Sequence, residues 1–107
     1  MSRFRIEHPT RENLHIIYGH DHMLGFFVEM FREGREKPLK SLDMFTHGKA
    51  VTLNDCFDFL ISVGVFTRPE LQQALALIQD GHPEPVPQGM ARTVEVVMGF
   101  KGAWGPA

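Results

Sequence analysis

Residues 52–81, TLNDCFDFLISVGVFTRPELQQALALIQDG, decide the fold, because two helix starts and two helix stops follow one another there. The segment 52–55 resembles a capping box with Asp55 in place of the usual Glu. Apolar residues then recur on one helical stripe until Gly64, which is typical of a helix end. We therefore predict a helix over residues 53–63.

A second helix start follows after a short link. The segment 67–70, TRPE, is a capping box with a proline in the first turn, and apolar residues continue on one stripe until Gly81. This pattern predicts a helix over residues 68–80. Two helices joined by so short a link form an αα-hairpin.

The sequence before this hairpin has the period-two alternation of strands. Phe4 and Ile6 alternate with charged residues, and residues 14–18 resume the pattern after Pro9. Residues 26–31, FFVEMF, are rich in side chains that favour strands, and a charged stretch suited to a tight turn follows them. We expect these segments, with a returning strand supplied by Leu39, Leu42 and Met44, to form an antiparallel sheet of about three strands.

A helix competes with a strand between residues 22 and 33. The apolar residues there also fall at helical spacing, with Asp21 as a candidate N-cap and Gly34 as a stop. The interior Gly25 and the Phe-Phe-Val run are poor choices for a helix, so the strand is favoured.

The last third begins with the proline-rich segment 82–89, which predicts an extended connector. Residues 90–101 fit both a helical stripe and a β-branched strand, and we favour the helix. Residues 102–107 are expected to be a flexible tail. The chain is therefore predicted to be one α+β domain over residues 1–101.

Composition restricts the classes of function. The chain has 107 residues, of which 43% are hydrophobic and 22% are charged, and its formal net charge is -2. A chain without a basic excess has no field to attract nucleic acid, so we expect none as a partner. No stretch approaches the roughly 20 apolar residues of a membrane span. The single cysteine, Cys56, cannot form an internal disulfide, which favours a soluble cytoplasmic protein.

One motif could carry metal chemistry. In an extended chain His20 and His22 share a face while Asp21 points away, so the two imidazoles could bind one zinc ion. Zinc needs a third protein ligand, and His47 is the first candidate. The other candidates are Asp43, Cys56 and His8. The competing interpretation is a polar turn in which Asp21 binds nearby backbone amides.

Other candidate groups have structural explanations. Cys56 lies in a predicted helix beside Phe57, which is typical of a buried and unreactive thiol. Asp55 and Asp58 are explained by helix capping and solvation. No Gly-x-Gly-x-x-Gly or Gly-Lys-Ser/Thr motif occurs, which excludes nucleotide binding by those routes.

A surface function remains. If residues 26–31 form a strand, Phe27, Glu29 and Phe31 share one face, and Phe26, Val28 and Met30 share the other. The helical hairpin can cover only one of these faces, so the first three residues are candidates for an interaction surface unless residues 90–101 cover them. The sequence favours a non-catalytic protein-binding module that binds a partner or itself as a homodimer. The alternative is a small zinc-binding protein or metal-dependent enzyme built on His20 and His22.

Overall fold

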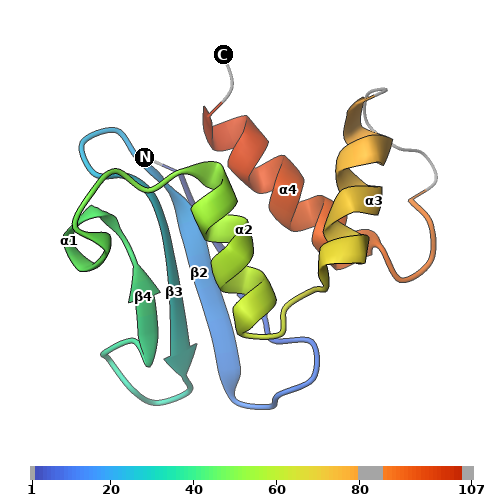
Figure 1. Ribbon diagram of the computed structural model, residues 1–107. Helices are drawn as coiled ribbons and strands as arrows, with labels where there is room; N and C mark the ends of the chain where they lie inside the picture. Colours follow the sequence, from blue (N-terminus) through green and yellow to red (C-terminus); the bar gives the residue numbers. More distant parts are fainter. Residues whose placement is uncertain (1, 80–85, 105–107) are drawn as a thin grey trace.

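The N-terminal part of the chain forms a four-stranded antiparallel sheet (Figure 1). The computed structural model describes the backbone of residues 2–79 and 86–104 and the side chains up to residue 100. The strands lie side by side in chain order: β1 (Ser2–Glu7), β2 (Leu14–Asp21), β3 (Gly25–Arg32) and β4 (Lys40–Leu42). The α+β architecture is confirmed, with four strands where about three were expected.

The returning strand is shorter than the sequence suggested. Met44 was expected on this strand, but it begins helix α1 (Met44–His47). The reason is local, because the Asp43 side chain accepts hydrogen bonds from the backbone N–H groups of Phe45 and Thr46, each at 2.9 Å. This cap starts a helical turn directly after β4.

Residues 25–32 form a strand, as the sequence favoured. β2 and β3 are joined by the turn 22–24, and Gly25 follows with a φ of 81° that glycine adopts without strain. The Asp21 carboxylate accepts hydrogen bonds from the N–H groups of Met23 and Leu24, at 2.7 and 3.1 Å. The turn therefore uses Asp21 as its anchor.

Both helices of the predicted hairpin are present. They are α2 (Leu53–Ser62) and α3 (Arg68–Gln79), each within two residues of the expected bounds in the described chain. Each begins with the predicted capping box: Asp55 N–H donates to Thr52 Oγ1 at 3.1 Å, and Thr67 N–H donates to Glu70 Oε1 at 2.9 Å.

The C-terminal element is the helix α4 (Ala91–Trp104), again as favoured. It continues three residues past residue 101, so part of the segment assigned to the tail is helical; residues 105–107 lie outside the described chain. The expected connector 82–89 is described only from residue 86 onward.

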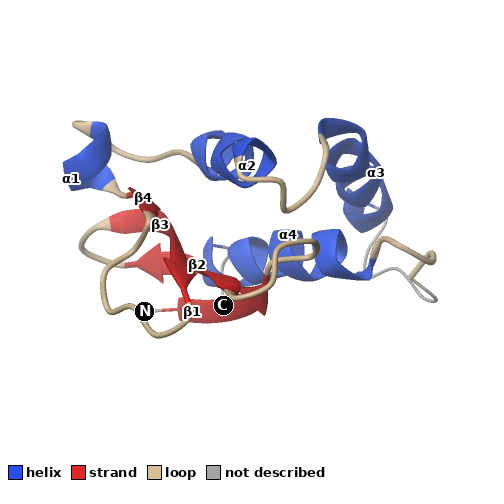
Figure 2. Cartoon of the chain, turned by 90° about the horizontal axis from the view of Figure 1, so that it is seen from below, coloured by secondary structure: helices blue, strands red, loops and turns tan. Residues whose placement is uncertain are grey.

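The helices lie on one side of the sheet (Figure 2). α2 contacts β3, α4 contacts β2, and α3 packs against α4, so the hairpin reaches the sheet mainly through its first helix. The side chains of the sheet that join the helices in one hydrophobic core are Ile6, Leu14, Ile16, Tyr18, Val28 and Met30. Among the described residues, no helix is long and apolar enough to cross a membrane.

The capping box of α3 makes a direct prediction. Thr67→Ala removes the hydroxyl that accepts from Glu70 N–H at 3.3 Å and donates to the Glu70 carboxylate at 2.9 Å. We expect the free energy of unfolding to fall by about 1 kcal/mol. For a domain of this size, that loss lowers the melting midpoint by roughly 4–8 °C.

Thermal unfolding followed by circular dichroism measures this change. Gln72→Ala is the matched control, because Gln72 is exposed in the interior of the same helix and alanine favours a helix. A Thr67→Ala midpoint equal to that of the control would contradict the capping role.

Candidate functional site

The residues of the predicted metal site lie in different local environments. His20 is near the end of β2, where its ring meets the Phe26 ring edge-on at 4.8 Å, and His22 is exposed in the following turn. His47 is the last residue of α1, and its Nε2 lies 3.4 Å from Asp55 Oδ2. Within the described part of the chain, no three His, Cys, Asp or Glu side chains gather closely enough to hold a metal ion.

The carboxylates near these histidines serve the backbone. Hydrogen bonds from Met23 and Leu24 N–H lower the pKa of Asp21. The pKa of Asp55 is lowered in the same way, first by the backbone N–H and then by the hydroxyl of Thr52. A carboxylate that already accepts two hydrogen bonds in a turn or cap is a structural group, and this explains both residues.

His8, a candidate third ligand in the sequence, has a structural role. Its ring is buried, its Nδ1 accepts from Thr10 and Arg11 N–H at 3.2 and 3.0 Å, and its Nε2 lies 2.7 Å from the Val63 carbonyl oxygen. Because Nδ1 accepts hydrogen bonds, the proton is on Nε2 and is donated to Val63. Both ring nitrogens are therefore engaged, and His8 ties the β1–β2 loop to the end of α2.

Cys56 is a core residue of α2. Its side chain is 0% exposed, and burial raises its pKa to about 12, with a smaller contribution from the charge of Asp55. A thiol that stays protonated at neutral pH is a poor nucleophile, because the thiolate is the reactive form. Cys56 therefore packs as a small apolar side chain of the core.

We expect native Cys56 to react very slowly with an aromatic disulfide reagent at pH 8 and rapidly once guanidinium unfolds the chain. The release of the coloured thiol measures both rates. Labelling of the native protein at the rate of the unfolded chain would show that the thiol is accessible.

The sheet face opposite the helices carries the predicted interaction residues. Strand pairing places Arg5, Ile17, Glu29 and Ser41 in one row across the four strands. We call this surface the open face, because in Figure 2 the described helices lie on the other side. By the alternation of the strands, its members are Arg3, Arg5, Glu7, His15, Ile17, Gly19, Phe27, Glu29, Phe31 and Ser41.

The three interaction candidates share this face but differ in accessibility. Phe27 lies across from Gly19 and is 8% exposed, so it is part of the floor of the face and does not protrude. The backbone of β1 fills the space that a side chain at position 19 would take. Glu29 and Phe31 are half-buried. Ile17, which the sequence did not single out, is in the centre at 9% exposure and stands apart from the core under the helices.

Ion pairs line one end of the open face. Arg5 contacts Glu7 at 3.0 Å and Glu33 at 3.6 Å, and His15 Nδ1 lies 3.6 Å from the same Glu33 carboxylate. The His15 ring stacks on Phe31 with 5.3 Å between the ring centroids. The half-exposed ion pairs are weak, worth at most about 1 kcal/mol each, so the charged groups can exchange partners.

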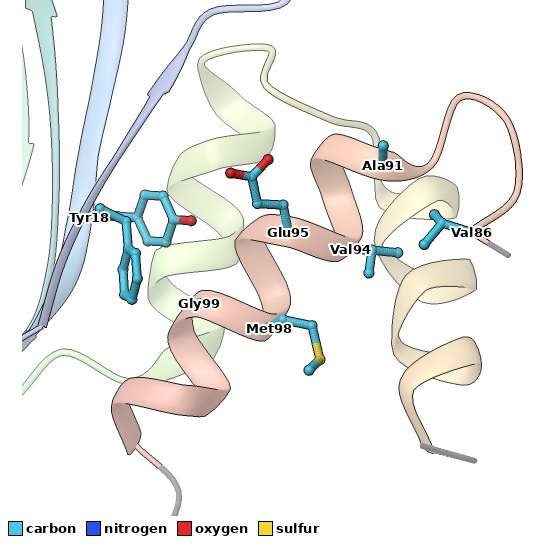
Figure 3. A pocket seen from close by; sticks show the side chains of 8 residues that line it. Tyr18, Val86, Ala91, Val94, Glu95, Met98 and Gly99 are labelled. Carbon is cyan, nitrogen blue, oxygen red and sulfur yellow. The ribbon is translucent and has the colours of Figure 1, made fainter. Parts of the chain in front are cut away.

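A pocket lies beside the core, between the sheet and α4 (Figure 3). Its volume is about 520 Å³, with Phe4 and Tyr18 on the sheet side and Val94, Met98 and Gly99 on the helix side. Ala91, Glu95 and Val86 complete the lining. The walls are apolar except for the Tyr18 hydroxyl, which points toward α4 in Figure 3, and the carboxylate of Glu95 on that helix.

Tyr18 forms the back of this pocket. Its ring stacks on Phe4 with 5.4 Å between the centroids and contacts the Phe100 ring at a tilt with 4.8 Å between the centroids, and the residue is 1% exposed. Burial, and then the nearby negative charge of Glu95, raise the pKa of Tyr18. The hydroxyl therefore stays neutral at physiological pH. The sequence alone does not reveal this pocket, because only the packing of α4 on β2 brings Gly99 and Tyr18 together.

No protein-family model matches the chain, and neither the curated proteins nor the solved structures give a match. The open face and this pocket are the candidate sites of the described chain.

The contact between Gly99 and Tyr18 predicts that alanine at position 99 destabilises the protein, the opposite of its usual effect in a helix. Alanine normally stabilises a helix by about 1 kcal/mol relative to glycine. At position 99 the added methyl would lie 2.9 Å from the Tyr18 hydroxyl oxygen and 3.0 Å from its Cε2. Because the buried ring also contacts Phe4 and Phe100, it has little room to move, and we expect Gly99→Ala to lower the free energy of unfolding by about 1–2 kcal/mol.

Chemical denaturation measures this loss, and a double-mutant cycle isolates its cause. In a Tyr18→Phe background the hydroxyl is gone, so Gly99→Ala should cost less than it does in the parent protein. If Gly99→Ala costs the same in both backgrounds, or stabilises the protein, the contact with the Tyr18 hydroxyl is not the reason for glycine at position 99.

Proposed function

We propose that this chain is a non-catalytic protein-binding module that self-associates, with the open face of one copy against the open face of another. The observation that carries the proposal is the row formed by Arg5, Ile17 and Glu29 on three adjacent strands. It is basic on one side, apolar in the centre and acidic on the other side.

This row is self-complementary under a two-fold axis parallel to β2. The rotation puts Ile17 over Ile17 of the second copy and Arg5 over Glu29, and the same pair forms a second time because the interface is isologous. Sheets that pack face to face lie about 10 Å apart, a gap that two such side chains can span. The same rotation puts Arg3 over Phe27, a cation over an aromatic ring.

Two features of the monomer favour this exchange. Glu7 and Glu33, the partners of Arg5 in the monomer, are more than half exposed, so Arg5 can turn to a second copy at little cost. Ile17 and Phe27 supply a flat apolar floor under the charged row. Charge pairs above such a floor set the orientation of an interface more than its strength, so we expect a weak dimer with a Kd in the micromolar range.

Metal binding by His20 and His22 lacks comparable support. The T-shaped contact with Phe26 accounts for the His20 ring, and no described group of three ligands includes either residue. The zinc-protein alternative stays a prediction from the sequence alone.

Charge reversal across the proposed axis tests the self-association. Arg5→Glu and Glu29→Arg each place like charges opposite one another in the dimer, so either change should leave the chain monomeric at concentrations where the parent protein dimerises. The double variant restores opposite charges and should restore the dimer. Sedimentation velocity over a range of protein concentrations measures the change.

Arg35→Glu is the matched control, since Arg35 is exposed outside the open face. It changes the net charge as Arg5→Glu does, and it should leave association as it is in the parent protein. Circular dichroism confirms that each variant is folded. A parent protein that stays monomeric throughout, or single and double variants that behave alike, would reject the proposed dimer.

A further inference from the structure

The pocket between β1, β2 and α4 is a separate feature from the open face. Phe4 lines it from the core side of β1, whereas Arg3 and Arg5 lie on the opposite side of the same strand. Its volume of about 520 Å³ falls within the range of roughly 300–1,000 Å³ typical of sites for small molecules. An inference about this pocket does not depend on self-association.

The lining combines a large apolar surface with two polar groups. Phe4, Val94 and Met98 provide aromatic and aliphatic walls, and Glu95 is the one charged residue among the described side chains of the lining. The Tyr18 hydroxyl lies at the Glu95 side (Figure 3). The hydroxyl is neutral, so it can donate or accept a hydrogen bond without adding charge.

These groups select the charge of a ligand. The carboxylate of Glu95 attracts a cation and repels an anion, and no lining residue in the described chain is positively charged. The exposed ring of Phe4 adds a surface that favours a cation over its face. An ammonium group can donate hydrogen bonds both to a carboxylate and to a tyrosine oxygen, whereas a carboxylate ligand would face Glu95 without a compensating base.

We propose that this pocket binds a small amine: a molecule with an apolar body and one ammonium group. The ammonium group lies between Glu95 and the Tyr18 hydroxyl, and the apolar body lies along Val94 and Met98. Removal of the Glu95 charge weakens binding of the amine and leaves binding of a neutral analogue of the same shape unchanged.

Three probes with a common body separate these contributions. They are 2-phenylethylamine, 2-phenylethanol and 3-phenylpropanoate, each titrated into 15N-labelled full-length protein at physiological salt. We expect the amine to produce saturable shift changes centred on the amides of Val94, Met98 and Gly99, with a dissociation constant on the order of 1 mM for so small a ligand. The alcohol should bind more weakly, and the propanoate weakest of the three.

Variants then assign the effect to the pocket. Glu95→Gln should weaken amine binding by up to about fivefold, because Glu95 is exposed and a charge pair in contact with water is weak, while binding of the alcohol is unaffected. Ala91→Trp, which adds a bulky group to the lining, should abolish binding of all three probes. Glu12→Gln is the control. Glu12 is exposed in the β1–β2 loop, so this substitution removes an equal charge at a place away from the pocket.

Three results would each overturn the proposal. One is that the propanoate binds as tightly as the amine, and another is that Glu95→Gln and Glu12→Gln have equal effects on the amine. The third is that no probe produces saturable shifts at the pocket. The dimer test is independent of these results, because its variants change Arg5 and Glu29 on the opposite side of the sheet.

Discussion

The contact of Tyr18 with Gly99 sets the distance between the sheet and α4, and much of the structure depends on it. A tyrosine ring in the centre of β2 needs space, and a helix residue without a side chain provides it. Phe100, the next residue of α4, also contacts the ring, with 4.8 Å between the centroids. The glycine destabilises the helix by about 1 kcal/mol relative to alanine, and the buried aromatic contacts offset this cost.

The same contact creates the pocket. α4 lies close to the sheet at Gly99, while one and two turns earlier its side chains are Glu95 and Ala91, which do not fill the space beside Phe4. Val94 and Met98 form the helix side of that space. The close approach of α4 to the sheet at Gly99 thus leaves a recess earlier along the helix. The side chains of α4 that face this recess determine whether it is filled.

Local signals in the sequence predicted the elements well, and non-local packing limited the rest. The boxes at Thr52 and Thr67 and the following apolar stripes depend on residues three or four apart, so both helices were predictable. The strand over residues 25–32 was separable from a helix because Gly25 and the Phe-Phe-Val run are poor choices for a helix. The alternation of apolar residues wrongly extends the returning strand to Met44, because the Asp43 cap starts a helix at that residue.

The sequence predicted which residues of β3 share a face, but not which residues of the other strands lie beside them. Alternation alone placed Phe27, Glu29 and Phe31 on one face, and pairing bears this out. The partners of Glu29 across the sheet, Ile17 and Arg5, follow only from the strand register. Register depends on how separate strands pair, and the order of residues along one chain does not show that pairing.

Strand β1 connects the two proposed surfaces, because its alternation sends Phe4 to the pocket and Arg3 and Arg5 to the open face. A slip of one residue in its pairing would put the arginines against the core and remove both surfaces at once. His8, directly after β1, opposes such a slip: its N–H donates to the Leu14 carbonyl oxygen at 3.0 Å.

The ring of His8 adds a second anchor. It is held by the Val63 carbonyl and by two amides of the β1–β2 loop. A shift of β1 would have to break these hydrogen bonds in a buried site, where each unpaired group costs about 1–3 kcal/mol. His8, a candidate metal ligand in the sequence, therefore fixes the register of the edge strand β1. The proposed dimer face and the proposed amine pocket both depend on this register.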